Sequence, residues 1–250
     1  MATREEMVSV KDLLESGAHF GHQKQRWNPK MKRFVFEKRN GIYIIDLAKT
    51  MQQLRVCIDV LDDVVTQHKP ILFVGTKKQA KEVVRNSAQE AGEFFVCERW
   101  LGGMLTNLST IRQSIKTLER YEKRIASGGE GLTKKEISQM KKDQIKLNRN
   151  LSGIRNMRKQ PGLLIVVDPN KEHIAVAEAK KLGIPVMALV DTNCNPDPID
   201  FVIACNDDAY KSIKLILSAL SNAIIAKKQE INVKISKDEE APEKGEEDDR

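Results

Sequence analysis

Five short, almost uninterrupted aliphatic segments constrain the fold of this 250-residue chain more than any other feature. Their apolar side chains do not alternate with polar ones. Strands of a parallel sheet that is covered on both faces have this pattern, whereas in strands with one solvent-exposed face apolar and polar residues alternate. The five predicted strands are residues 71–74, 94–96, 163–167, 185–190 and 201–204.

Helical patterns lie between these strands. Thr76 and Gln79 are placed as a capping box for the second helix. Alternation of strands and helices predicts an α/β fold, a doubly wound parallel five-stranded sheet with right-handed crossovers. The predicted helices are residues 47–68, 77–91, 172–182 and 208–228.

One connection, between the strands at 94–96 and 163–167, is too long for a simple crossover. It holds two stretches whose apolar residues step by three and four, separated by the glycine-rich segment 127–131. That spacing predicts an inserted antiparallel helical hairpin with coiled-coil packing. Glu122 and Gln144 interrupt the apolar seam, so we expect local looseness there. The seam residues are Leu108, Ile111, Ile115, Leu118, Ile125, Ile137, Met140, Leu147, Leu151 and Ile154.

A basic segment precedes the sheet. Residues 23–39 carry seven cationic side chains and one acid, with Trp27 and Asn28 among them. Cations supply phosphate contacts, and an aromatic ring or an amide can meet bases. Asn40-Gly41 then separates two apolar runs, which is a strong signal for a tight β-hairpin. The pattern favours RNA binding by a loop held on a rigid element.

Charge is segregated along the chain. The net charge is +7, but residues 104–160 alone have fourteen bases and five acids, and residues 237–250 have eight acids and three bases. Such a surface attracts polyanions. The acidic residues 231–250 lack aromatics and periodicity, so they are predicted to be disordered.

Other classes of protein fit the composition less well. No apolar run approaches the ~20 residues that span a bilayer, and the first seven residues do not resemble a secretory signal. We therefore expect a cytoplasmic protein without membrane partners. The four cysteines are scattered, and we expect them to be buried apolar side chains and neither disulfides nor zinc ligands.

Two groups of residues could bind a phosphate or a metal ion. Residues 75–78 follow a strand and open a helix, as phosphate-binding loops do, but they lack the spacing of a P-loop. Carboxylates at the carboxyl edge of a parallel sheet can hold Mg²⁺. The favoured interpretation is that Asp168 and Asp207 are helix caps or turn residues and that Asp191 and Asp208 are solvated, with a structural divalent ion left open. These carboxylates are Asp168, Asp191, Asp207 and Asp208.

Three further side chains have two interpretations each. His19 and His22 could bind a metal, but no third ligand can be identified, so packing or a phosphate hydrogen bond is favoured. Trp100 could be a core residue or a platform for RNA. No catalytic motif is recognisable, and we predict neither an enzyme nor a bound cofactor or metal.

Several short motifs resemble those of the ribosomal protein S2 family, in its bacterial or organellar branch. The match runs in order from about residue 7 to residue 228, and RWLGGMLTN at 99–107 is the most specific block. The others are GAHFGH at 17–22, RWNPKM at 26–31, RNGI at 39–42, FVGTK at 73–77, GIPV at 183–186, VDTN at 190–193 and NDDA at 206–209.

The resemblance implies a flavodoxin-like domain, binding to 16S-type ribosomal RNA, contact with neighbouring small-subunit proteins, and docking of ribosomal protein S1, hence indirect recruitment of messenger RNA. It implies a structural and not an enzymatic role. The expected division is residues 1–46 (N-terminal helix, basic loop and β-hairpin), 47–103 with 160–230 (α/β domain), 104–159 (helical hairpin) and 231–250 (disordered tail).

The candidate RNA-binding residues lie on two surfaces. In the basic loop they are Lys24, Arg26, Trp27, Asn28, Lys30, Lys32 and Arg33. On the hairpin they are Arg112, Lys116, Lys134, Lys135, Lys141 and Lys142. The alternative hypothesis is a magnesium-dependent phosphoryl-transfer or response-regulator-like domain that uses Asp168, Asp191 and Asp207.

Overall fold

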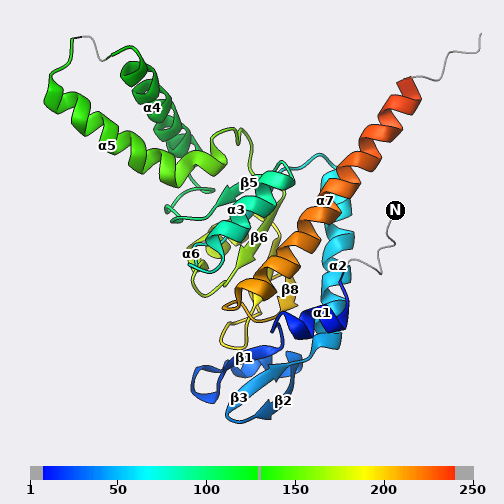
Figure 1. Ribbon diagram of the computed structural model, residues 1–250. Coiled ribbons are helices and arrows are strands. Elements are labelled where there is room, and N and C mark those ends of the chain that lie inside the picture. The colour runs from blue at the N-terminus through cyan, green and yellow to red at the C-terminus, as the bar shows by residue number, and fades with distance from the viewer. Residues whose placement is uncertain (1–7, 129–130, 240–250) are drawn as a thin grey trace, which may run out of the picture.

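A five-stranded parallel sheet forms the centre of the protein (Figure 1), in a computed structural model that describes residues 8–128 and 131–239. The strand order is β5-β4-β6-β7-β8, with every neighbouring pair parallel. This is the flavodoxin-like order, in which the winding reverses between β4 and β6. The strands are β4 (Ile71–Val74), β5 (Phe94–Val96), β6 (Leu163–Val167), β7 (Val186–Val190) and β8 (Phe201–Ala204). The predicted fold class is therefore confirmed.

Both faces of the sheet are covered, as the unbroken aliphatic runs predicted. Ile71 and Phe73 face a core shared with α2 (Leu47–Thr66), α3 (Lys81–Glu90) and α7 (Tyr210–Glu239). Leu72 and Val74 face a second core, shared with α6 (His173–Lys181) and the base of the helical hairpin. A short α1 (Val10–Glu15) packs beside α2 and α7.

Two helix boundaries differ from the prediction by more than two residues. Helix α3 begins at Lys81, not residue 77, and Thr76 does not cap it. The Thr76 backbone N–H and hydroxyl both donate to Glu172 Oε1, at 2.8 and 2.6 Å. A tertiary partner thus replaced the local capping box.

Helix α7 continues to Glu239, so the prediction of disorder from residue 231 is wrong for residues 231–239. Glu230 pairs with Lys227 and Lys234 at 3.0 and 2.6 Å, one helical turn away on each side. Such i,i+3 and i,i+4 pairs support a helix beyond the core. Residues 240–250 of the predicted disordered tail lie outside the described residues.

The long connection forms a projecting arm (Figure 1), built from α4 (Leu108–Ala126) and α5 (Lys134–Leu151) and closed by a short 3₁₀ turn (Ser152–Ile154). Apart from Leu108, which is half-buried, the seam residues are buried near the sheet domain and half-buried toward the tip. At the interruption of the seam, Glu122 accepts a hydrogen bond from Arg155 at 3.1 Å. The predicted looseness at Glu122 is therefore replaced by a polar contact.

An antiparallel three-stranded sheet forms the N-terminal unit, in the order β1-β3-β2. The strands are β1 (Phe20–Gln23), β2 (Val35–Arg39) and β3 (Ile42–Ile45). The predicted hairpin turn is confirmed, with φ of 49° at Asn40 and 82° at Gly41. Both values are positive, as a type I′ turn requires. Strand β1 was not predicted.

The N-terminal unit is fixed to the sheet domain by apolar and backbone contacts. Met31, Phe34 and Ile45 are buried in the second core, on the sheet face that carries Leu72 and Val74. Asn28 donates its backbone N–H to the Thr192 carbonyl at 2.9 Å. The basic loop is therefore mounted on a packed element. Among the described residues, no helix is both long and apolar enough to cross a membrane.

Candidate nucleic-acid interface

The basic loop is held in shape by its two non-cationic candidates. Asn28 caps the 3₁₀ helix Pro29–Phe34, its side chain accepting from the Lys30 backbone N–H at 3.0 Å. The Trp27 ring stacks on Tyr43 with centroids 4.7 Å apart, and its indole N–H is buried. Trp27 and Asn28 therefore hold the loop in shape.

The loop cations divide into two groups. Lys24, Arg26 and Lys32 are exposed and form no ion pair with any described residue. Lys30 instead pairs with Asp197, and the Arg33 guanidinium lies 4.7 Å from the centre of the Phe34 ring. The first three side chains carry uncompensated charge, and the other two already have partners.

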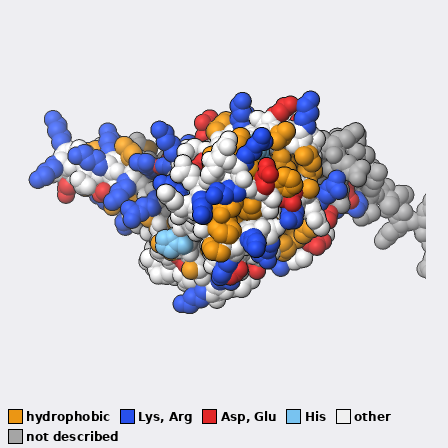
Figure 2. Space-filling model, turned by 90° about the horizontal axis from the view of Figure 1, so that it is seen from below, with side chains coloured by type: hydrophobic (Ala, Val, Ile, Leu, Met, Phe, Trp, Pro, Cys, Tyr) orange, Lys and Arg blue, Asp and Glu red, His pale blue; other side chains and the backbone are white. Residues whose placement is uncertain are grey.

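The arm carries a second set of cations. All six candidates on it are exposed, and within the described part of the chain none has a carboxylate partner. Figure 2 shows Lys and Arg side chains over the projecting arm. The candidates are Arg112 and Lys116 on α4, and Lys134, Lys135, Lys141 and Lys142 on α5.

Glu178 fixes the loop from which the arm begins, and sequence reasoning missed it. Its carboxylate accepts from the Trp100 indole N–H, from the backbone N–H groups of Gly103, Leu105 and Thr106, and from the Thr106 hydroxyl, at 2.7–3.0 Å. Burial raises the pKa of Glu178, but these hydrogen bonds outweigh it and hold the pKa below its ordinary value. The only signal in the sequence was an acid among the buried alanines of α6.

Trp100 is a core residue, which settles the two interpretations of the sequence. Only 7 % of its surface is exposed, and its single donor is engaged by Glu178 at 3.0 Å. A ring with this burial cannot serve as a stacking platform. The motif around Trp100 thus builds the base of the arm.

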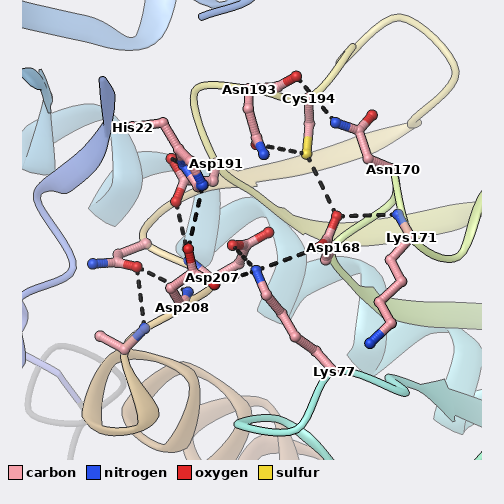
Figure 3. Close-up of polar contacts among 12 residues, drawn as sticks. His22, Lys77, Asp168, Asn170, Lys171, Asp191, Asn193, Cys194, Asp207 and Asp208 are labelled. Atoms are coloured by element: carbon pink, nitrogen blue, oxygen red, sulfur yellow. Dashed lines mark hydrogen bonds and ion pairs between the residues drawn. The ribbon is translucent and has the colours of Figure 1, made fainter. Parts of the chain in front are cut away.

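The carboxyl edge of the main sheet gathers the four aspartates (Figure 3). Lys77 Nζ lies 3.3 Å from Asp168, 2.6 Å from Asp207 and 2.6 Å from Asp208. Burial alone lowers the pKa of Lys77, but the three carboxylates reverse the effect and raise it. Residues 75–78 thus supply a counter-ion to the aspartates.

The favoured interpretation of these aspartates was wrong for Asp191. Asp168 is a turn residue, with φ of 62° and a hydrogen bond from Lys171 N–H. Asp191, which was expected to be solvated, is only 1 % exposed, and its neighbour Asp207 is 0 % exposed. Burial, together with the charges of Asp191 and Asp168, raises the pKa of Asp207 to about 7.

His22 lies against the same edge. Its Nδ1 is 3.1 Å from Asp191 Oδ1 and its Nε2 is 3.3 Å from Asp208 Oδ2, and the contact with Asp191 is the largest cause that raises the pKa of His22. His19 does not join this group, and burial lowers its pKa. The four cysteines are buried and free, as predicted.

The phosphoryl-transfer hypothesis requires Asp168, Asp191 and Asp207 to meet, and they do. However, burial closes Asp191 and Asp207 to a substrate, and Lys77 occupies the space beside Asp168 and Asp207. The fold and its surfaces define a class of protein: an α/β domain that displays two cationic extensions.

Comparison with known proteins gives the family. Residues 13–227 match the family model of ribosomal protein S2. The chain is 72 % identical to small ribosomal subunit protein uS2 of Protochlamydia amoebophila, over 96 % of this chain and 88 % of the relative. It is 63 % identical to the protein of that name from Chlamydia felis (91 % and 84 % covered) and 62 % identical to that from Chlamydia abortus (91 % and 83 % covered). The chain therefore belongs to the ribosomal protein S2 family, whose members are structural proteins and not enzymes.

Proposed function

We propose that this protein, a structural protein of the small ribosomal subunit in the cytoplasm, binds 16S-type ribosomal RNA through its basic loop and its arm. The observation that carries the proposal is the set of exposed cations without ion-pair partners on two packed extensions. Cations that no carboxylate neutralises are free to replace the counterions of a phosphate backbone. The protein acts in translation by binding, without chemistry of its own.

In the basic loop, Lys24, Arg26 and Lys32 are assigned to phosphate contacts. Their neighbours Trp27 and Asn28 hold the backbone, so the three cations are presented in a fixed pattern. Phosphate contacts of this kind set the register of a protein on folded RNA. Lys30 and Arg33 are assigned a smaller share, because each already has a partner within the protein.

The arm is assigned to a second RNA surface at a distance from the loop (Figure 1). Its base is anchored at two points. Arg149 pairs with Glu98 at 2.8 Å, and Gly153 lies so close to the Phe95 carbonyl that a Cβ would be 2.1 Å away. An anchored arm loses little conformational freedom when it binds, which favours affinity.

Docking of ribosomal protein S1, with indirect recruitment of messenger RNA, is part of the same proposal. Its support is the family resemblance. Contacts with other neighbouring small-subunit proteins are proposed on the same ground.

The test uses the full-length protein and small-subunit ribosomal RNA. Binding is measured across a salt series for wild type, Arg26→Ala, Lys32→Ala and the double variant. Removal of one cation that meets a phosphate is expected to weaken binding and to reduce the log–log salt slope by about one unit. Lys69→Ala is the matched control, because Lys69 is an exposed cation that precedes β4 at the opposite edge of the sheet. Unchanged affinity and slope in the double variant would reject the loop assignment.

A further inference from the structure

One acidic side chain gathers three cations in the corner between the arm and the sheet domain. Lys81 and Arg85 lie on α3, and Arg149 lies on α5 of the arm. Glu98 follows β5, beside which the arm leaves the sheet domain (Figure 1). Its Oε2 accepts hydrogen bonds from Lys81 Nζ and Arg149 Nη2, both at 2.8 Å. Its Oε1 lies 3.7 Å from Arg85 Nη2, so one carboxylate joins α3 to the arm.

Glu98 is a fixed negative charge. Only 15 % of its side chain is exposed. The hydrogen bond from Lys81 is the largest cause that holds the pKa of Glu98 below its ordinary value, and the bond from Arg149 acts in the same direction. The carboxylate therefore stays ionised at neutral pH and holds the cations in place.

The two arginines keep hydrogen-bonding capacity that the protein does not use. Arg149 donates Nε and Nη2 to Glu98, and Arg85 donates Nη2 to Cys97 Sγ at 3.5 Å. Among the described residues, Nη1 of either guanidinium has no hydrogen-bond partner. Both side chains are open to solvent, with 47 % of Arg85 and 67 % of Arg149 exposed.

Positive charge is in excess in this corner. Three cations pair with Glu98, and one further acid, Glu82, acts on Arg85 through its charge. Glu82 is exposed and forms no ion pair with any described residue. Two acids therefore face three bases, and the corner attracts an anion.

We propose that Glu98 organises Lys81, Arg85 and Arg149 into a binding site, the corner site, for a backbone phosphate of RNA. The corner site rests on the proposed function and adds a contact at the base of the arm. A guanidinium presents a planar fork of donors that fits the oxygens of a phosphate. Small-molecule sites enclose their ligand. These cations instead lie on an open surface, as contacts to a nucleic-acid backbone do.

Glu98 is the positioning residue of the corner site, and the cations meet the phosphate. Ion pairs with Glu98 restrict side chains that would otherwise rotate freely, so less conformational freedom is lost on binding. The cations come from both α3 and α5. A bound phosphate would therefore also hold the arm against the sheet domain.

The experiment measures binding of the full-length protein to small-subunit ribosomal RNA across a salt series. Arg85→Ala is expected to weaken binding about three- to tenfold and to reduce the log–log salt slope by about one unit. Glu98→Gln gives the sharper test, because it removes a negative charge. A surface that attracts RNA only by its net charge would bind more tightly after this change. Loss of a positioned site instead weakens binding about three- to tenfold and lowers the slope.

Glu82→Gln is the matched control, since it removes the same charge from an exposed position one helical turn from Arg85. This variant should bind RNA as tightly as wild type or slightly more tightly. Urea unfolding of each variant gives the folded fraction. Partial unfolding would lower the amount of active protein without changing the salt slope. Arg85 is half-exposed, so its replacement should leave the fold intact.

Two results would overturn the corner site: RNA binding by Glu98→Gln that equals or exceeds that of wild type, or unchanged affinity and slope in Arg85→Ala. Absence of RNA binding by wild type would overturn it together with the proposed function. The loop double variant, Arg26→Ala with Lys32→Ala, separates the two hypotheses. If that variant binds more weakly while the corner variants bind as wild type does, the corner site fails and the loop assignment stands.

Discussion

Replacing Glu178 by Gln should loosen the base of the arm. The Glu178 carboxylate accepts five hydrogen bonds at 2.7–3.0 Å, three of them at one oxygen from Leu105 and Thr106. A glutamine keeps one oxygen for Trp100 and Gly103 but turns an NH₂ group toward the other donors. Two backbone N–H groups are then left unsatisfied, at about 1–3 kcal/mol each. The free energy of unfolding should therefore fall by about 2–6 kcal/mol.

The measurement is urea unfolding followed by far-UV circular dichroism. Glu90→Gln is the matched control, because Glu90 is exposed on α3 and makes the same change of charge without a partner among the described residues. That control should stay within about 0.5 kcal/mol of wild type. If Glu178→Gln behaves as the control does, the carboxylate does not hold the loop and the reasoning fails.

The same substitution has a predicted pH dependence. The pKa of Glu178 lies below its ordinary value of 4.5 in the folded protein. A depressed pKa stabilises the fold above the unfolded-state value, and that contribution is lost as pH falls through the folded-state value. The difference in stability between wild type and Glu178→Gln should be largest near neutral pH and shrink below about pH 4.5.

Three further predictions concern two glycines and the cysteines. Gly41→Ala should destabilise the protein by about 1–2 kcal/mol in thermal melts, because φ is 82° at this position. Gly102→Ala is the control and should change the stability little, because Gly102 has open space around it and no positive φ. Equal effects of the two substitutions would contradict the turn assignment. Gly153→Ala should lower the free energy of unfolding in urea by about 3 kcal/mol, because the new Cβ would lie 2.1 Å from the Phe95 carbonyl oxygen. An unchanged free energy of unfolding would show that this contact relaxes freely. The four cysteines should not react with a thiol reagent at pH 8 until the protein is unfolded, since all are buried and burial raises the pKa of Cys57 to about 12; rapid reaction of the native protein would contradict that burial.

Local patterns predicted the elements of this fold well. The aliphatic runs identified all five strands of the main sheet, because a parallel strand buried on both faces has no polar side. The seam spacing predicted the arm, and Asn40-Gly41 predicted the hairpin turn. Each of these signals is carried by residues that are neighbours in the sequence.

Contacts between distant residues were not predictable in the same way. Nothing near Glu178 indicates that it accepts hydrogen bonds from residues 100–106, and nothing near Thr76 indicates that Glu172 replaces its capping role. His22 had no visible third ligand for the same reason, because Asp191 and Asp208 reach it only through the sheet topology. Helix α7 extends beyond its predicted end, where ion pairs between side chains on its own surface stabilise it.

Lysine reactivity in assembled small subunits tests the central claim most directly. Free protein and intact subunits are treated with an acylating reagent, and modification is read out by mass spectrometry for Lys24 and Lys32 of the loop, Lys116 and Lys142 of the arm, and Lys69 as the control; all five are exposed in the protein alone. Contact with RNA predicts strong protection of the loop lysines and of one face of the arm in the subunit, with Lys69 reacting as before. Loop and arm lysines that react in the subunit as fast as in the free protein would contradict the account.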